Sequence, residues 1–173
     1  MGDPVDLRGR RVLVCGYGIA GQAAVRALTA ERASVAVTAD APIDGRIAMT
    51  DRAGPITAVP DDVELVVVSP GYPPTHPLLV DAAQRGIPVW GEVELAWRLQ
   101  GPDAAPWLAL TGTNGKTTTV HMLESMLRAA GLRALAVGNV GQSLIDAVRA
   151  VPAYDVLAVE LSSQQLHFAP SIA

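Results

Sequence analysis

Hydrophobic residues occur along this chain in short runs, and segments of helical periodicity lie between them. In residues 120–127, for example, apolar side chains recur at steps of three and four, which predicts an amphipathic helix. Short apolar runs separated by helices are typical of a parallel sheet that is covered on both faces. The pattern therefore predicts an α/β protein with strands at residues 11–15, 34–38, 63–68, 87–90, 107–110, 134–137 and 155–159.

One stretch interrupts this periodic pattern and divides the chain. Residues 100–106 are polar and rich in proline and glycine, and they lie between two periodic segments, which is typical of a linker. The sequence therefore predicts a Rossmann-like parallel-sheet domain at residues 1–100, followed by the start of a P-loop-type ATP-binding α/β domain at residues 101–173. Residues 41–62 are predicted to be irregular, with one short strand near Ile56.

The composition supports a packed protein and excludes some classes of function. Hydrophobic residues make up 50% of the 173 residues, and the net charge of −4 with no basic cluster argues against nucleic-acid binding. Cys15 is the only cysteine, so no internal disulfide can form. The sequence shows no secretion leader and no apolar run approaching about 18 residues. We therefore expect a cytoplasmic protein that does not insert into a membrane.

The strongest candidate for chemistry lies near the start of the second predicted domain. The apolar run 107–110 leads into Thr-Gly-Thr-Asn-Gly-Lys-Thr at residues 111–117, and a helical pattern follows. In such a turn the backbone N–H groups point at phosphate oxygens, and the helix N-terminus adds partial positive charge. Lys116 would reach the outer phosphates, and the Thr117 hydroxyl would bind Mg²⁺. The loop is shorter than the common phosphate loop, because Leu110 stands where that pattern has its first glycine.

A second glycine-rich turn follows the first predicted strand. Residues 16–21 have the pattern Gly-x-Gly-x-x-Gly at a strand-to-helix junction, where the backbone can approach an anion closely. The acidic residue that would bind a ribose hydroxyl is displaced, because Thr38 ends the next strand and Asp40 lies two residues further on. A nicotinamide dinucleotide site and a turn that binds no dinucleotide both remain open on this pattern.

Further candidate residues follow the carboxyl ends of other predicted strands, where ligands bind in open α/β sheets. Gly71 lets the backbone approach a ligand, and His76 either contacts a phosphate or caps the next helix. Glu160 ends the last strand and is placed to hold Mg²⁺ directly or through water. Glu92 and Glu94 are two residues apart on a helix, so we interpret them as solvated side chains and not as a catalytic pair.

Together these motifs resemble the ATP-dependent Mur ligases of peptidoglycan synthesis. The resemblance rests on residues 111–119, on Gly-Asn-Val-Gly at 138–141 and on Glu-Leu-Ser-Ser-Gln-Gln-Leu at 160–166. Residues 16–21, 69–71 and 76–77 point to the members of the family that add D-glutamate to UDP-N-acetylmuramoyl-L-alanine.

The resemblance implies a role for each group of residues. The first domain would bind the UDP part of the muramoyl substrate and not NAD. ATP would phosphorylate the terminal carboxylate of that substrate to an acyl phosphate, which the amine of D-glutamate would then attack. Lys116 and Glu160 would be catalytic, and Thr117 and Glu160 would contact Mg²⁺. The ATP site would comprise Gly112, Thr113, Asn114, Gly115, Lys116, Thr117 and Thr118, and the substrate site would comprise Gly18, Ile19, Ala20, Gly71 and Asn139.

The resemblance also sets an expectation about length. Members of the family have a longer central domain and a third domain, which carry a modified lysine, a His–Asp segment and the D-glutamate site. We therefore expect an N-terminal fragment with an unpaired sheet edge and an uncovered apolar face, which binds ligands without turnover. Gln164 replaces a common Phe and is expected to loosen packing nearby. The open alternatives are an NAD(P)-dependent dehydrogenase that uses residues 16–21 and a non-catalytic nucleotide-binding module.

Overall fold

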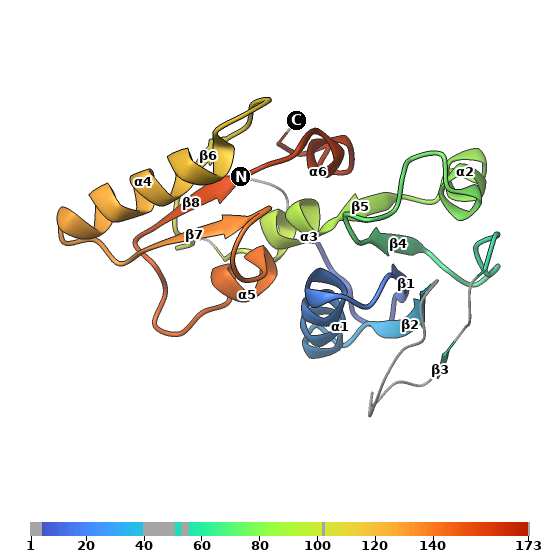
Figure 1. The fold of residues 1–173 in the computed structure, drawn as a ribbon. Helices are drawn as coiled ribbons and strands as arrows, with labels where there is room; N and C mark the ends of the chain where they lie inside the picture. The colour runs from blue at the N-terminus through green and yellow to red at the C-terminus, as the bar shows by residue number, and fades with distance from the viewer. Residues whose placement is uncertain (1–4, 40–50, 53–55, 102, 173) are drawn as a thin grey trace.

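Two parallel β-sheets organise the computed structural model (Figure 1), which describes residues 5–39, 51–52, 56–101 and 103–172. The first sheet has the strand order β3-β2-β1-β4-β5 and contains β1 (Arg11–Cys15), β2 (Ser34–Thr38), β3 (Asp51–Arg52), β4 (Leu65–Val68) and β5 (Val89–Gly91). The second has the order β6-β8-β7 and contains β6 (Trp107–Leu110), β7 (Ala134–Gly138) and β8 (Val156–Glu160). Every pair of neighbouring strands is parallel.

The helices connect these parallel strands and cover the sheets. They are α1 (Ile19–Ala30), α2 (Pro77–Gln84), α3 (Glu92–Leu99), α4 (Lys116–Ala129), α5 (Leu144–Val148) and α6 (Ser163–His167). The predicted α/β class with Rossmann-like parallel sheets is therefore confirmed. The short strand expected near Ile56 lies instead at β3, and Asp40 lies outside the described residues. None of the described helices has the length and apolar character needed to cross a membrane.

The first sheet is buried on both faces, which explains why its strands are continuous apolar runs. Successive side chains of a strand point to opposite faces. In β1, Val12 and Val14 therefore belong to one core cluster with α1, whereas Leu13 and Cys15 belong to a second cluster with α2. The continuous apolar run that predicted this strand thus arises because each face of β1 packs in a different hydrophobic cluster.

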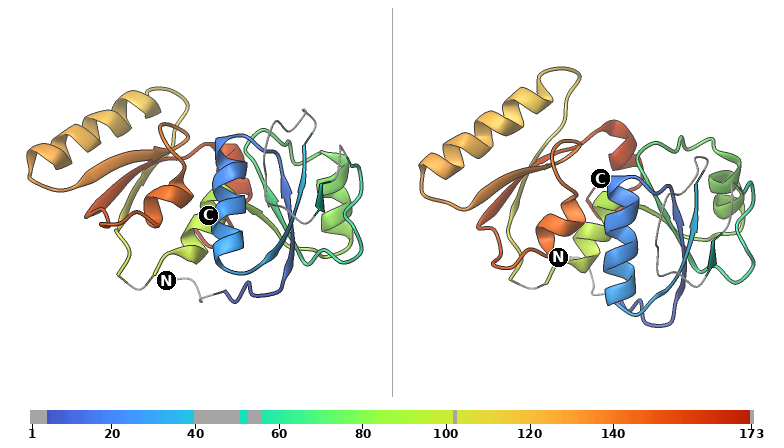
Figure 2. Two further views of the ribbon diagram at one scale, coloured as in Figure 1. Left: turned by 90° about the horizontal axis from the view of Figure 1, so that it is seen from below. Right: turned by 60° about the horizontal axis from the view of Figure 1, so that its bottom comes forward.

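Helix α5 joins the two sheets. It belongs to the second half of the chain, yet it packs against α1 and α3 of the first half, and Figure 2 shows these three helices meeting between the sheets. Leu144, Ile145 and Ala147 of α5 are buried in the same hydrophobic cluster as Val12 and Val14 of β1. Burial of apolar area contributes about 25 cal/mol per Å², so this shared cluster favours a fixed arrangement of the two sheets.

The interpretation of Glu92 and Glu94 as solvated side chains is wrong. Helix α3 lies between the first sheet and helices α5 and α6, so even its acidic residues are enclosed, and these two are 5% and 0% exposed. Glu94 pairs with Arg98 and accepts hydrogen bonds from the backbone N–H and the hydroxyl of Ser171, at 3.0 and 2.7 Å. Periodicity within one helix could not reveal this enclosure, because the covering groups come from distant parts of the chain.

The second sheet has the open edge that was expected. Among the described residues β6 pairs only with β8, and Leu108 on β6 is 43% exposed. Met122 and Met126 on α4 are 62% and 66% exposed, so apolar surface is uncovered on this side of the protein. Gln164 is exposed on α6, whereas the neighbouring Gln165 is buried, so Gln164 occupies no core position and the loosening expected there does not arise.

Replacing Gly21 with Ala is predicted to destabilise the fold. A Cβ at this position would lie 2.1 Å from the carbonyl oxygen of Gly16, which is backbone and cannot move independently. Overpacking of this kind typically lowers the free energy of unfolding by about 1–3 kcal/mol. The matched control is Gly18→Ala in the same turn, where a Cβ would meet nothing within 4 Å. Urea unfolding should give a lower midpoint for Gly21→Ala only, and equal midpoints would contradict the prediction.

Candidate active site

The phosphate loop forms an open turn between β6 and α4. Residues 111–115 are exposed. Gly115 is the N-cap of α4 with φ +75°, a left-handed conformation that favours glycine, and no side chain caps the helix. The first N–H groups of a helix have no intrahelical partner and, together with the helix dipole, attract anions. The turn therefore has the geometry to offer backbone donors to a phosphate, and the binding of ATP there stays a prediction.

Lys116 lies at the first position of α4 and folds back over the loop. Its ammonium group donates a hydrogen bond to the carbonyl oxygen of Gly112 at 2.8 Å. This contact holds the positive charge above the turn while leaving it in reach of solvent. Lys116 is the only lysine in the sequence.

Three of the predicted site residues, Thr117, Asn139 and Glu160, meet at the carboxylate of Glu160. Its carboxylate ends β8 and is 1% exposed. The Thr117 hydroxyl donates to Oε2 at 2.9 Å, and the Asn139 side-chain amide donates to Oε1 at 3.0 Å. Both carboxylate oxygens are thus held, one by the phosphate loop helix and one by the segment after β7.

The register of the second sheet produces this convergence. Glu160 is paired with Leu110 on one side and with Gly138 on the other, so all three strands end at the same level. Gly138 has φ +102°, and a Cβ there would lie 2.2 Å from the carbonyl oxygen of Glu160. Glycine is therefore required at this position for Asn139 to donate its backbone N–H to the same carbonyl, at 2.9 Å.

The oxygen pair of Thr117 and Glu160 fits the coordination chemistry of Mg²⁺. At a typical Mg–O distance of 2.0–2.1 Å, two adjacent ligands of an octahedral ion are separated by about 2.9 Å. The hydroxyl and carboxylate oxygens are 2.9 Å apart. Among the described residues no group of three His, Cys, Asp or Glu side chains could hold a metal by itself. An ion at this pair would therefore need water and phosphate oxygens as its other ligands, which Mg²⁺ commonly uses.

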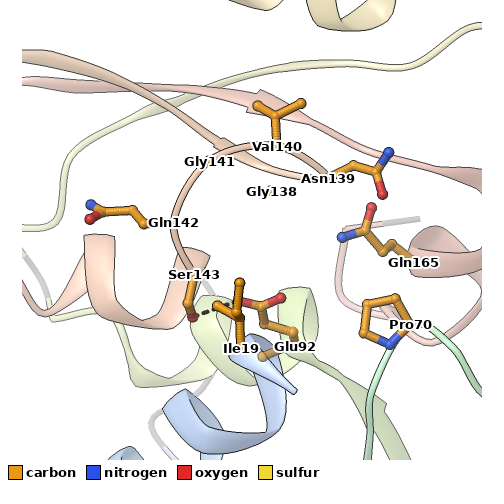
Figure 3. Close-up of a pocket in the computed structure, with 11 residues that line it drawn as sticks. Ile19, Pro70, Glu92, Gly138, Asn139, Val140, Gly141, Gln142, Ser143 and Gln165 are labelled. Atoms are coloured by element: carbon orange, nitrogen blue, oxygen red, sulfur yellow. Dashed lines mark hydrogen bonds between the residues drawn. The ribbon is translucent and has the colours of Figure 1, made fainter.

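A cavity of about 210 Å³ lies where the carboxyl ends of the two sheets face each other. Figure 3 shows Ile19, Pro70 and Asn139 on different sides of it. The predicted substrate residues Ile19, Ala20 and Asn139 line this cavity. Gly18 and Gly71 are exposed and adjoin lining residues in the sequence. The structure thus brings the start of α1, which follows the glycine-rich turn 16–21, and the Gly-Asn-Val-Gly segment 138–141 to one opening.

Sequence reasoning missed several residues that line this cavity, chiefly Glu92, Ser143 and Gln165. Gln165 forms a capping box with Ser162, in which each side chain accepts a hydrogen bond from the other residue's backbone N–H. The Ser-x-x-Gln spacing was a readable signal for this helix start. His76, left open between two roles, caps α2 by accepting a hydrogen bond from the Leu78 N–H at 3.3 Å.

Glu92 is a buried acid at the junction of the two sheets. Its Oε1 accepts hydrogen bonds from the Ser143 hydroxyl at 2.6 Å and from the Leu144 N–H at 2.8 Å. Burial raises the pKa of Glu92 above its ordinary value of 4.5, the hydrogen bonds from Ser143, Leu144 and Ile145 oppose that rise, and the nearby Asp146 adds to it.

Comparison with known proteins identifies the family. The protein-family model described as Mur ligase middle domain matches residues 110–171, and a second family model, described as putative NAD(P)-binding, matches residues 4–91. The UDP-N-acetylmuramoylalanine--D-glutamate ligases of Streptomyces avermitilis and Frankia casuarinae are 52% and 53% identical to this chain, over 95% and 98% of its length. The chain belongs to the Mur ligase family. It spans 37% of the length of each of these two Mur ligases.

A solved structure of another Mur ligase also resembles the chain. This is the UDP-N-acetylmuramate:L-alanyl-gamma-D-glutamyl-meso-diaminopimelate ligase from Neisseria meningitides, with 17% identity and a TM-score of 0.45. The match covers 87% of this chain and 52% of that one.

Replacing Glu92 with Gln is predicted to remove a pH-dependent loss of stability. A raised pKa means that the folded state binds the proton more tightly, so wild-type stability falls as pH rises from about 4.5 through the raised pKa. Every tenfold difference in proton affinity between the folded and unfolded states is worth about 1.4 kcal/mol. Gln cannot ionise, and its Oε1 can still accept both hydrogen bonds. Urea unfolding between pH 4 and 8 should show a stability difference in favour of Glu92→Gln that grows with pH. A stability difference between the two proteins that did not change with pH would contradict the raised pKa of Glu92.

Proposed function

We propose that these residues belong to a ligase that adds D-glutamate to UDP-N-acetylmuramoyl-L-alanine with the hydrolysis of ATP, in the cytoplasm, during peptidoglycan synthesis. The single observation that carries the proposal is the meeting of Thr117, Asn139 and Glu160 beside an open phosphate loop. The relatives that are about half identical to the chain are named as D-glutamate-adding ligases, which supports the same reaction. Cys15 is buried and is the only cysteine of the sequence, so no internal disulfide can form, which agrees with a reducing compartment.

In this proposal residues 112–118 hold the triphosphate of ATP. The loop N–H groups and the α4 N-terminus bind phosphate oxygens, and Lys116 neutralises charge on the transferred group. Thr117 and Glu160 would hold Mg²⁺, which supplies further charge neutralisation when bound. Phosphoryl transfer requires positioning and electrostatic stabilisation more than a reactive side chain, and this site offers both.

The nucleotide-sugar substrate would occupy the cavity between the sheets. We propose that residues 1–100 form the domain that binds its UDP part, through Gly18, Ile19, Ala20 and Gly71, and that residues 101–173 belong to the ATP-binding domain. Asn139 would contact the substrate near the reacting carboxylate, because it lies between the cavity and Glu160. That carboxylate would attack the γ-phosphate to give an acyl phosphate and ADP. The amine of D-glutamate would then displace phosphate.

An NAD(P)-binding function for the first half is the second candidate. It is favoured by the glycine-rich turn and by the description of the model that matches residues 4–91. Against it, β2 ends in Thr38, which is 1% exposed and carries no carboxylate for a ribose. Fluorescence titration with NADH and competition with a UDP-sugar separates the two, and tight binding of NADH alone would favour the dehydrogenase function.

Replacing Lys116 with Ala is predicted to weaken ATP binding by about ten- to a hundredfold, because a hydrogen bond to a charged group contributes about 1.5–3 kcal/mol. UDP-N-acetylmuramoyl-L-alanine should bind as before, since Lys116 does not line the cavity. Arg128→Ala is the matched control, because it removes one positive charge from the last turn of the same helix. Calorimetric titration measures both affinities. Unchanged ATP affinity in Lys116→Ala would show that the phosphate loop is wrongly assigned.

The 173-residue chain is predicted to bind these ligands without catalysing ligation. It spans 37% of the length of the relatives described above, and among the described residues Glu160 is the carboxylate that accepts a hydrogen bond from Thr117 at the start of the phosphate-loop helix. The measurement is phosphate release from ATP with UDP-N-acetylmuramoyl-L-alanine present, with and without D-glutamate. No D-glutamate-dependent release is expected, and a clear dependence would show that these residues suffice for turnover.

A further inference from the structure

The segment between β7 and α5 is anchored at both of its ends by buried acids. At one end Asn139 donates its backbone N–H to the Glu160 carbonyl oxygen at 2.9 Å, and its side-chain amide to Glu160 Oε1 at 3.0 Å. At the other end Ser143 and Leu144 donate to Glu92 Oε1 at 2.6 and 2.8 Å. Residues 139–143, here called the bridging loop, are therefore held at one end by Glu160, which ends β8, and at the other end by Glu92, which directly follows β5.

The hydrogen bonds to Glu92 lie in the protein interior and are well shielded from water, whereas the side-chain bond from the exposed Asn139 to the buried Glu160 is only partly shielded. Glu92, Ser143 and Glu160 are 5%, 3% and 1% exposed. Within the bridging loop Gly141 has φ +69°, and a Cβ there would lie 3.0 Å from the Ala136 carbonyl oxygen, so the backbone packs closely on β7. A short loop with both ends fixed in this way has few alternative conformations. Its position is therefore set by where Glu92 and Glu160 stand.

Glu92 is the anchor that comes from the first half of the chain. It is the first residue of α3, directly after β5, and so it moves with the sheet that carries Ile19 and Pro70. Figure 3 shows Glu92 beneath the cavity with its hydrogen bond to Ser143, close to Ile19. The hydrogen bonds to Glu92 thus help to set the distance across the cavity between Asn139 and the first sheet, and they lie away from the phosphate loop.

We propose that Glu92 is a positioning residue, which by holding Ser143 and Leu144 fixes the bridging loop so that Asn139 and the α1 N-terminus line one site for the nucleotide-sugar. This inference rests on the proposed function, because it takes the cavity as the site for that substrate. Glu92 acts through the loop and not by touching the reacting atoms. No role for Glu92 follows from the sequence pattern, which indicated a solvated side chain.

Two ion pairs also connect α1 and α5, and they do not serve the same purpose. Arg26 pairs with Asp146 and Arg149 pairs with Glu31, both at 2.7 Å, and all four side chains are about one-third exposed or more. Exposed pairs of this kind contribute little. They attach to α5 at Asp146 and at its C-cap Arg149, whereas Glu92 holds Ser143 and Leu144, the residues at which the bridging loop enters the helix.

The test is the affinity of the 173-residue chain for UDP-N-acetylmuramoyl-L-alanine, measured by calorimetry at a temperature where every variant is folded. Glu92→Ala removes both hydrogen bonds of this anchor and should weaken binding about tenfold, whereas Ser143→Ala leaves the bond from the Leu144 N–H and should weaken binding less. Glu92→Gln keeps the acceptor oxygen and should bind within about twofold of wild type. ATP affinity should change less than threefold in all of them. Glu31→Gln breaks an ion pair of the same interface and should leave both affinities unchanged.

A double-mutant cycle with Asn139→Ala separates positioning from a general structural role. If Glu92 acts through Asn139, the variant lacking both side chains binds no more weakly than Asn139→Ala alone. The inference would be overturned if the fold-loss in the double variant equalled the product of the two single losses, or if Glu92→Ala and Ser143→Ala both bound normally. In either case, weaker binding by Asn139→Ala would still support the proposed function. No binding by wild type, or normal binding by Asn139→Ala, would overturn the substrate contact and the inference with it.

Discussion

The candidate site depends on the buried carboxylate of Glu160. A carboxylate removed from water is stable only when its oxygens are hydrogen bonded or close to a cation. Thr117 bonds one oxygen and Asn139 the other, so the phosphate loop helix and the bridging loop are positioned by a single group. Because β8 is the central strand of its sheet, the neighbouring strands carry these two donors to opposite sides of the same carboxylate. In the proposed function Mg²⁺ would be held by this same pair of oxygens: the Thr117 hydroxyl would keep its proton, turn it away from Glu160 and offer an oxygen lone pair to the ion.

The second constraint is the packing of α5 against α1 and α3. One hydrophobic cluster runs from β1 through these helices to β7 and β8, so the two sheets are not joined by the linker alone. Within this apolar junction Glu92 is a buried acid, and desolvation there raises its pKa. A buried polar group that is satisfied by specific donors favours one arrangement of its surroundings over others. Fixed relative placement is what a substrate cavity between two sheets needs.

The strands, the α/β class and the phosphate loop could be predicted because each depends on local sequence. A continuous apolar run followed by glycine encodes a buried strand and its turn within about ten residues, as at β1 and β6. The convergence of Thr117 and Glu160 was also accessible, since parallel strands in one sheet end at the same edge. Burial of Glu92 and Glu94 was not, because the groups that enclose them lie about 50 and 77 residues away in the sequence. The capping role of His76 required the observed backbone geometry of α2.

The use of cations in this chain supports a special role for the phosphate loop. Ion pairs that join distant parts of the structure use arginine, as in Arg26 with Asp146 and Arg149 with Glu31. The planar guanidinium suits such fixed pairs, whereas an ammonium is a compact charge on a flexible stem that can follow a group during reaction. The only lysine of the sequence stands at Lys116, where its one described hydrogen bond is to a carbonyl of its own loop. A phosphate bound in the loop can replace the Gly112 carbonyl as the hydrogen-bond partner of Lys116. This exchange breaks no contact between helices or strands, so the positive charge of Lys116 can serve the ligand at little cost to the stability of the fold.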